Sequence, residues 1–279
     1  MAGSSDTARA RALKGASETL FIPLSARALA RRKYPKYGFA DTAAEDLAAR
    51  LEVNTLRYAW SDITAGACIL RAQWFDRICT DFIKRHDNAV VLSLGSGLNT
   101  MYERVAATIG RRRFHWIDSD LPDVVALRRD LFPEDRRRVH KVLDLNAPDI
   151  LASAGIEPGA PLLAVAEGLL IYLPPMTVRG TFRALHGAGA EVAFDWTGPM
   201  ATRAGRLNPA LIFTRDRSVR FTWHLTTPRL MRGWRPPWRP TESFDLISGT
   251  GLAGAAMQRL HRLFNAGQWI YGCTHARPA

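Results

Sequence analysis

The sequence predicts an α/β fold with a mostly parallel sheet, helices on both faces of that sheet and a helical cap at the N-terminus. The first observation is that five short apolar runs alternate with helical stretches between residues 89 and 195. The second is that two of these runs, AVVLSL and PLLAVAE, are apolar almost throughout, as strands buried on both faces are. With 279 residues, of which 47% are apolar, the chain can bury such a sheet in one large domain or two small ones.

Helical periodicity dominates residues 1–86. A first helix is indicated after Pro23 by PLSARALARRKY, and a second by DTAAEDLAARLE, where Asp41 is a typical N-cap. The third and longest stretch is AGACILRAQWFDRICTDFIKRH, whose apolar residues recur at the spacing of an amphipathic helix. We expect these helices to form a cap or lid over the rest of the chain.

Residues 87–279 are expected to form the core. Its five strands are AVVLSL, FHWID, VHKVLDL, PLLAVAE and EVAFDW. The helices between them are NTMYERVAATIG, PDVVALRRDLF, PDILASAG and PPMTVRGTFRALHG. This alternation of strand and helix is typical of a doubly wound parallel sheet.

The last part of the chain is less regular. Residues 199–220 indicate an irregular or helical insertion. FTWHL and QWIYGCTH are candidate strands, with AAMQRLHRLF as a helix between them. The segment GWRPPWRP (233–240) is expected to be a long loop or lid, because its prolines lack N–H donors and fix φ.

The charge of the chain limits the classes of partner. Lys and Arg number 38 against 26 Asp and Glu, a formal net charge of +12. Such a charge suits nucleic-acid binding, but the basic residues are scattered arginines without interleaved aromatic residues. We therefore prefer solvated helix faces in an arginine-rich composition, and nucleic acid is not the expected partner. An attraction for acidic small molecules survives either interpretation.

The cysteines and the hydropathy pattern indicate a compartment. Cys68, Cys79 and Cys273 form neither a CxxC pair nor an even framework, which predicts reduced thiols and no metal site. No stretch of 18 uninterrupted apolar residues is present, and MAGSSDTARARAL lacks the apolar core of a signal peptide. A soluble, cytoplasmic protein without a membrane segment is expected.

The first turn from strand to helix carries two glycines. Gly95 and Gly97 in VVLSLGSGLNT allow a sharp turn and the close approach of a ligand to the backbone. The third glycine of the dinucleotide fingerprint is missing, so pyrophosphate need not be the ligand and a nicotinamide-dependent oxidoreductase is disfavoured. Glycine at such a turn also occurs for packing alone.

Carboxylates follow the next three strands. Asp118 and Asp120 end the second strand, where a carboxylate beside a glycine turn can accept hydrogen bonds from both hydroxyls of a ribose. Asp144 ends the third strand, and Glu167 followed by Gly168 ends the fourth. Asp120 also suits a helix N-cap and Asp144 a turn. Glu167 favours function, because it lies at the edge where open α/β sheets bind ligands.

Four strings in order, LSLGSGLNTMYERV, DSDLPDVVALRRDLF, VLDLNAP and AEGLLIYLPP, resemble the leucine carboxyl methyltransferase family. The resemblance covers residues 66–196, and SETLFIPLSARAL is similar to its bacterial tetracenomycin-type polyketide O-methyltransferases. It implies a class I, Rossmann-like methyltransferase that uses S-adenosyl-L-methionine and releases S-adenosyl-L-homocysteine.

The resemblance also implies roles for individual residues. Arg71 would hold the methionine carboxylate, although on the pattern alone it is a surface arginine of an amphipathic helix. Asp120 would bind the ribose, with Asp118 as a helper. Asp144 and Leu145 would contact the adenine, and Glu167 would lie near the methionine end of the cofactor. The implied cofactor residues are Arg71, Gly95, Ser96, Gly97, Asp118, Asp120, Leu121, Asp144, Leu145 and Glu167.

Two positions depart from the family pattern. The family commonly reads LGxGLDTR, whereas this chain has Asn99 and Met101. The change removes an internal ion pair, weakens cofactor binding or alters the substrate end of the site, and these alternatives stay open.

The acceptor decides whether a base is needed. A carboxylate is already ionised at pH 7, whereas a phenol benefits from a base. No catalytic residue is assigned, and His115, His224 and Tyr172 are the candidates. The arginine excess favours an acidic substrate and hence carboxyl methylation.

We therefore expect an O-methyltransferase that acts on a carboxylate, or a phenol, of a small acidic or polyketide-like metabolite. Its pocket would combine the N-terminal helices, the 199–220 insertion and the tryptophan-rich 233–240 loop. A protein or RNA methyltransferase, suggested by the charge, and a catalytically silent nucleotide-binding regulatory module, suggested by Asn99 and Met101, remain alternatives. The specific acceptor and the oligomeric state stay open.

Overall fold

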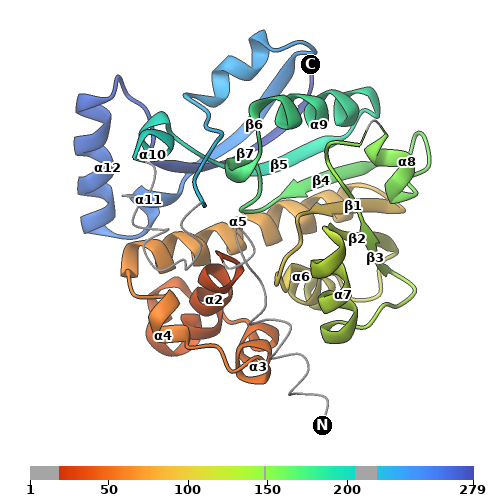
Figure 1. Ribbon diagram of the computed structural model, residues 1–279, viewed down its shortest axis with the longest axis horizontal. Helices are drawn as coiled ribbons and strands as arrows, with labels where there is room; N and C mark the ends of the chain where they lie inside the picture. Colours follow the sequence, from red (N-terminus) through yellow and green to blue (C-terminus); the bar gives the residue numbers. More distant parts are fainter. Residues whose placement is uncertain (1–18, 148, 205–218) are drawn as a thin grey trace.

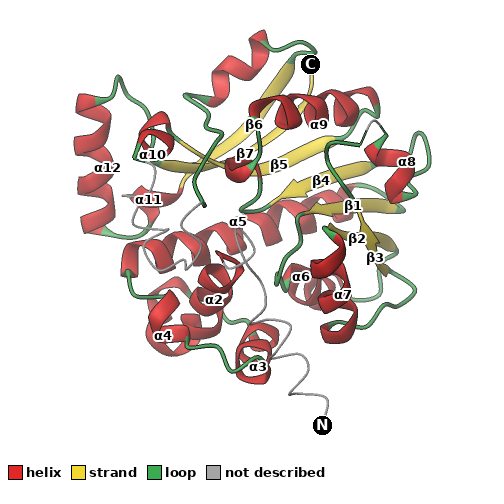
Figure 2. Cartoon of the chain, viewed as in Figure 1, coloured by secondary structure: helices red, strands yellow, loops and turns green. Residues whose placement is uncertain are grey.

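The computed structural model describes residues 19–147, 149–204 and 219–279, and it confirms the α/β fold (Figures 1 and 2). Seven strands form one sheet in the order β3-β2-β1-β4-β5-β7-β6. The strands are β1 (Ala89–Leu94), β2 (Phe114–Asp120), β3 (Arg138–Val142), β4 (Leu162–Ala166), β5 (Glu191–Thr197), β6 (Trp238–Asp245) and β7 (Tyr271–Pro278). The five predicted strands are thus all present.

The direction and order of the strands indicate which edge of the sheet can bind a ligand. β1 to β5 are parallel, while β7 runs antiparallel to both β5 and β6. The chain leaves β1 toward β2 and β3 on one side and then returns to β4 on the other. The carboxyl ends of β1 and β4 therefore form a topological switch point, where open α/β sheets bind ligands.

Both faces of the sheet are covered by helices. On one face, Val90 and Leu92 pack with Phe182. On the other, Val91 and Leu163 belong to the cluster that contains Phe75 and Val105. The first face carries α8 (Ile150–Ala154) and α9 (Pro175–Gly187), and the second carries α5 (Asp62–Arg85), α6 (Met101–Ile109) and α11 (Leu246–Gly249).

The predicted N-terminal helices are present beside α5. Asp41 is the expected N-cap, since its side chain accepts a hydrogen bond from Ala44 N at 2.9 Å. The helices are α2 (Phe21–Lys33), α3 (Thr42–Arg50) and α4 (Thr55–Tyr58), and α2 packs against α3, α4 and α5. The first begins two residues before Pro23. Figure 1 shows this group on the side of α5 that lies away from most of the sheet.

Six further helical segments are present among the described residues. They are η2 (Pro35–Tyr37), α7 (Pro122–Leu131), η3 (Leu170–Tyr172), α10 (Pro199–Arg203), η6 (Pro228–Gly233) and α12 (Leu252–Phe264). In the described ranges no helix has the length and apolarity needed to cross a membrane.

Two expectations for the last part of the chain were wrong. Residues 238–240 of the proline-rich segment are not a loop but the start of β6. Pro240 is tolerated there because β6 is an edge strand and its register shifts between Pro240 and Glu242. FTWHL, a candidate strand, forms no strand and pairs with none. Of the expected 199–220 insertion, residues 205–218 lie outside the described residues.

Candidate functional site

A cavity of about 540 Å³ lies where the carboxyl ends of β1 and β4 meet the N-terminal helices. Its walls are mainly apolar and aromatic. Ile22 and Pro23 come from α2, Trp60 precedes α5, and Tyr172 and Phe221 form an aromatic pair on another wall, with ring centroids 5.3 Å apart. Such walls suit a small organic molecule with an apolar body.

The walls only partly match the expected pocket. The N-terminal helices contribute as expected, and Ala201 and Phe221 line the cavity from either side of residues 205–218. Within the described chain, the 233–240 segment contributes no lining residue. Trp238 is completely buried in the core beneath α9 instead, and Trp234 packs on Phe182. The expectation that this segment forms a pocket wall was therefore wrong.

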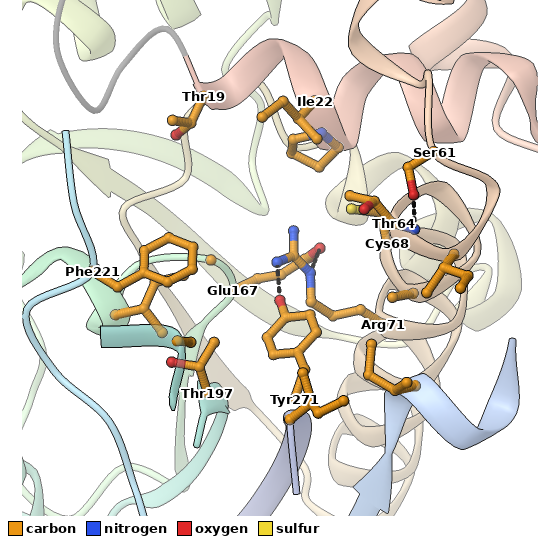
Figure 3. Close-up of a pocket in the computed structure, with 18 of the residues that line it drawn as sticks. Thr19, Ile22, Ser61, Thr64, Cys68, Arg71, Glu167, Thr197, Phe221 and Tyr271 are labelled. Atoms are coloured by element: carbon orange, nitrogen blue, oxygen red, sulfur yellow. Dashed lines mark hydrogen bonds and ion pairs between the residues drawn. The ribbon is translucent and has the colours of Figure 1, made fainter. Parts of the chain in front are cut away.

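The polar floor of the cavity is centred on Arg71 of α5 (Figure 3). Its Nε donates to Oε1 of Glu167 at 3.0 Å, and its Nη1 donates to Oδ2 of Asp195 at 3.0 Å and to the Tyr271 hydroxyl at 2.5 Å. The remaining nitrogen, Nη2, has no hydrogen-bond partner among the described residues and points into the open part of the cavity. The floor thus presents one free pair of N–H donors to a ligand.

The sheet topology brings these groups together. Glu167 directly follows β4, and Asp195 lies near the carboxyl end of the neighbouring strand β5. Tyr271 starts β7, and because β7 is antiparallel its first residue pairs with Thr197 at the same edge of the sheet. Asp195 also accepts from Gly168 N at 2.6 Å, which fixes the backbone just after Glu167.

Charge balance sets the protonation of the floor. Burial favours the neutral form of Glu167, but the guanidinium groups of Arg71, Arg27 and Arg104 outweigh it, so the pKa of Glu167 lies below its ordinary value. The pKa of Tyr271 is raised well above its ordinary value, chiefly by burial. Its hydroxyl therefore stays protonated and donates to Asp195.

Asn99 and Met101 are the two departures from the family pattern. The uncharged side chain of Asn99 connects the backbone of Met101 to Glu167 in the floor of the cavity. The Asn99 Nδ2 donates to Oε2 of Glu167 at 2.7 Å, and its Oδ1 accepts from Met101 N at 3.0 Å. The Met101 side chain is buried and its sulfur lies 3.7 Å from the Cys79 sulfur. Glu167 thus receives its second hydrogen bond from an amide, with no further charge introduced.

The glycine turn lies beside this floor and is held by Asp120. Gly95 and Gly97 have φ of +60° and +48°, the region that favours glycine. Asp120 accepts from Gly97 N at 2.7 Å and from Leu121 N at 2.8 Å, and burial raises its pKa. The side chain of Leu20 packs so closely over Gly97 that a Cβ there would lie 2.4 Å from it. Gly97 is therefore favoured by its backbone conformation, and a larger residue there would also have to displace the Leu20 side chain.

Two residues expected at the cofactor have their polar atoms engaged inside the protein. Asp118 is 3% exposed, and its carboxylate accepts from Trp116 Nε1 at 3.0 Å and Arg138 Nε at 2.7 Å and lies 2.9 Å from Arg128 Nη2. Ser96 is also buried, and its hydroxyl accepts from the backbone N–H of the residue before Asp120 at 3.0 Å. Both side chains therefore support the turn from below and do not reach the cavity.

Other expected residues lie away from the cavity. Asp144 is exposed and accepts hydrogen bonds from Asn146, while Leu145 is half-buried against the core. His115 faces solvent at the second residue of β2, far from the carboxyl end of that strand. His224 is exposed and contacts Thr202. Neither histidine is placed to take a proton from a molecule bound in the cavity, whereas the third candidate, Tyr172, lines it.

Sequence reasoning did not single out Asp195 and Tyr271. Asp195 interrupts the apolar strand EVAFDW at a 0% exposed position, and this buried acid was a usable signal. Tyr271 gave no local signal, because it joins the floor only through the pairing of β5 with β7.

The donor set of the floor fits the amino-acid end of S-adenosylmethionine. The free Nη2 of Arg71 suits a carboxylate, and the ionised Glu167 beside it suits an ammonium group. Gly95 of the glycine turn lines the same cavity. Asp120 is not among the described residues that line the cavity; it lies on the other side of the glycine turn, where it accepts a hydrogen bond from Gly97 N.

Comparison with known proteins supports this interpretation. The leucine carboxyl methyltransferase family model matches residues 5–186. The tetracenomycin polyketide synthesis O-methyltransferase TcmP of Streptomyces glaucescens is 30% identical over 247 residues, 87% of each chain. The S-adenosyl-L-methionine-dependent methyltransferase dpfgK of Gibberella zeae is 28% identical over 78% of each chain.

Solved structures share the fold. A Thermobifida fusca protein assigned as a methyltransferase has a TM-score of 0.51 and 17% identity, and the match covers 91% of this chain and 94% of that one. The CurJ carbon methyltransferase has a TM-score of 0.53 and 12% identity, with coverage of 90% and 69%.

Proposed function

The chain belongs to the leucine carboxyl methyltransferase family and is an S-adenosylmethionine-dependent methyltransferase, and on this premise we propose that it methylates a carboxylate oxygen of a small, largely apolar, polyketide-like acid. The observation that carries the proposal is the cavity in which an apolar enclosure meets the floor of Arg71 and Glu167. The relative that acts in tetracenomycin polyketide synthesis supports the same class of acceptor.

The binding roles follow from the donor set. Arg71 Nη2 would hold the methionine carboxylate, Glu167 the ammonium group, and Asp120 the ribose hydroxyls. When bound, the cofactor supplies a methyl carbon that is already activated by the sulfonium. The chain then has to orient the acceptor and exclude water, and the walls of Ile22, Pro23 and Phe221 suit that task.

The choice of a carboxylate over a phenol rests on the groups that line the cavity. Burial raises the pKa of Tyr172 to about 12 and that of Tyr271 well above its ordinary value, so neither is a base at neutral pH. No histidine or lysine is among the described lining residues, and the ionised Glu167, whose pKa is lowered, is too weak a base for a phenol. An acceptor that is already ionised needs no base, so a carboxylate fits this set better than a phenol.

The arginine excess does not support an acidic acceptor in the way that the sequence suggested. Arginines were expected to surround the substrate, but Arg71 is the sole arginine among the described lining residues, and it is paired with Glu167 and Asp195. The neutral hydroxyls of Ser61, Thr64 and Thr197 also line the cavity. The carboxylate preference therefore depends on the missing base and not on a guanidinium clamp.

Calorimetric titration tests the cofactor assignment at these residues. We expect S-adenosylmethionine and S-adenosylhomocysteine to bind and NADH, the control, not to bind. Arg71→Met should abolish binding of both sulfur compounds, whereas replacing the exposed Arg112, which pairs with Asp87 at the surface, should leave it unchanged. If Arg71→Met binds both sulfur compounds as well as wild type does, the floor of the cavity is not the site of the amino-acid end of the cofactor.

A second experiment tests the acceptor group. Methyl transfer from tritium-labelled cofactor is measured with 2-naphthoic acid and with 2-naphthol as matched probes. A methyl ester releases labelled methanol in mild alkali, whereas an aryl ether does not. Alkali-stable label on the naphthol, with none on the acid, would overturn the carboxylate proposal and leave the methyltransferase assignment intact.

A further inference from the structure

A buried arginine beneath the glycine turn has no part in the floor of the cavity. Arg128 of α7 is 0% exposed. Its Nη1 donates toward three carbonyl oxygens of the turn, those of Ser96 at 3.3 Å, Gly97 at 2.7 Å and Asn99 at 3.2 Å. One guanidinium nitrogen thus gathers the backbone of the segment that the proposed function assigns to the cofactor.

The guanidinium is itself fixed in place. Its Nη2 lies 2.9 Å from Oδ2 of Asp118, and its carbon lies 4.7 Å from the centre of the Phe132 ring. A buried charge is tolerated when it is paired and hydrogen-bonded in this way. The carboxylate expected to help with the ribose therefore has a different role, which is to hold Arg128.

One peptide unit is held from both ends. The carbonyl oxygen between Ser96 and Gly97 faces Arg128, while the N–H of the same planar unit donates to Oδ2 of Asp120. Because a peptide unit is rigid, the position of Arg128 determines where that N–H points. The N–H in turn fixes the carboxylate that would receive the ribose hydroxyls.

We infer that Arg128, held by Asp118, is a positioning residue for the cofactor site: it orients the Ser96–Gly97 peptide and, through it, the Asp120 carboxylate. The inference rests on the proposed role of the glycine turn and Asp120. Arg128 is not among the described residues that line the cavity. Its effect on the cofactor is therefore indirect and acts through backbone geometry.

Arg138 provides a matched control within the same cluster. It is 1% exposed, its Nε donates to the same Oδ2 of Asp118 at 2.7 Å, and it lies over the same Phe132 ring at 4.9 Å. Its Nη1 donates to Glu103 at 2.5 Å. Within the described part of the chain, none of its hydrogen bonds reaches the glycine turn. Loss of Arg138 should therefore damage the cluster without releasing the peptide.

The test compares Arg128→Met, Arg128→Lys and Arg138→Met. Melting curves define a temperature at which each variant is folded, and calorimetry then gives the dissociation constant of S-adenosylmethionine. We expect Arg128→Met to weaken binding about tenfold or more, as loss of hydrogen bonds from a charged donor does. Arg128→Lys, which keeps a charge but loses the fork, should lie between it and wild type. Arg138→Met should bind like wild type despite its lower stability.

Hydrogen exchange of the Gly97 amide gives a readout that needs no cofactor. It should speed up in Arg128→Met and stay slow in Arg138→Met. Equal losses of affinity in the two methionine variants, or wild-type affinity in Arg128→Met, would overturn the inference. If Arg128→Met does not fold, wild-type affinity and slow exchange in Arg128→Lys would do the same. A wild-type protein that does not bind the cofactor would instead count against the proposed site itself.

Discussion

Asn99 is the side chain through which the glycine turn contacts the floor of the cavity. Its Nδ2 lies 2.7 Å from Oε2 of Glu167. We expect Asn99→Asp to place two carboxylates at this distance, where they oppose each other's ionisation. The loss of a hydrogen bond to a charged group should lower the free energy of unfolding by about 1–3 kcal/mol. Urea unfolding at pH 7 measures this change.

A neighbouring cation should reduce that loss. Met101 is buried and contacts Cys79, so Met101→Arg alone would bury an unpaired guanidinium and destabilise the protein. In the double variant the new arginine can pair with the new aspartate, as in the pattern LGxGLDTR. The double variant should therefore be more stable than the sum of the two single losses predicts. Strict additivity would show that the two positions do not act as a pair.

Asp120 is the carboxylate whose removal should affect the cofactor most directly. Asp120→Ala removes the acceptor proposed for the ribose and frees Gly97 N, so S-adenosylmethionine binding should weaken by about 1–3 kcal/mol. Calorimetry measures the change, with Asp123→Ala, an exposed acid of the following helix, as the control. An unchanged affinity in Asp120→Ala would remove this residue from the ribose site.

The pKa of Asp120 should also determine how cofactor binding depends on pH. Burial raises the pKa of Asp120 above its ordinary value, and the ionised form is the one that accepts from two hydroxyls. Affinity should therefore decline as the pH falls through that raised pKa, at a higher pH than an ordinary aspartate would cause. A calorimetric pH series should show this decline in wild type and not in Asp120→Asn.

The floor shows what residue patterns can and cannot predict. Glu167 was identified because a charged residue at the end of an apolar strand has few structural explanations. Arg71 needed the family resemblance, since its helix pattern alone describes a surface residue. Asp195 and Tyr271 contact each other across 76 positions of sequence. They meet because β5 and β7 pair antiparallel, and the periodicity of either segment alone does not predict that pairing.

At the scale of elements, alternation of apolar runs with helical periods predicted β1 to β5 and the helices between them. The exception is β6, which begins at Trp238 inside a proline-rich segment. Proline counts against a central strand, yet an edge strand has N–H groups that need no partner. Because position within a sheet is a tertiary property, the segment alone did not reveal it.

Gly198 joins β5 to α10 at the edge of the cavity. A Cβ there would lie 2.1 Å from the carbonyl oxygen of Trp269, just before β7. Gly198→Ala should push the two strand ends apart and destabilise the protein by about 1–3 kcal/mol, as overpacking does. Gly180→Ala is the control, because Gly180 lies in α9 with open space around it and alanine favours a helix. Urea unfolding measures the free energy of unfolding of both variants. Equal values for Gly198→Ala and Gly180→Ala would contradict the close contact at Gly198.

For the whole molecule, part of the arginine excess is internal. Arg27, Arg71, Arg104, Arg128 and Arg138 all have side chains that are at most 10% exposed, and all are paired with carboxylates. Arg27 and Arg104 share Asp41 and so join α2 and α6 to the cap of α3. The ion pairs of Arg71 and Arg104 connect the N-terminal helices to the sheet domain, so the stability of the fold depends on ionised acids.

Asp118 allows this dependence to be isolated. The guanidinium groups of Arg128 and Arg138, helped by the Trp116 N–H, outweigh burial and lower its pKa from 3.8 to about 2. Because the folded-state pKa is the lower one, the stabilisation is complete above the ordinary pKa and is lost as the pH falls from about 4 to about 2. A shift of this size corresponds to about 2 kcal/mol at neutral pH.

Asp118→Asn should therefore be less stable than wild type at pH 7 by at least this amount, and the difference should narrow steadily below pH 4. Urea unfolding followed by tryptophan fluorescence at several pH values measures both proteins. Glu191, whose pKa is also lowered to about 2, titrates in both and cancels from the difference. A gap that stays constant down to pH 3 would mean that the arginines do not hold Asp118 in its ionised form. A gap that closes would show that acid unfolding of the whole molecule begins in part beneath the glycine turn.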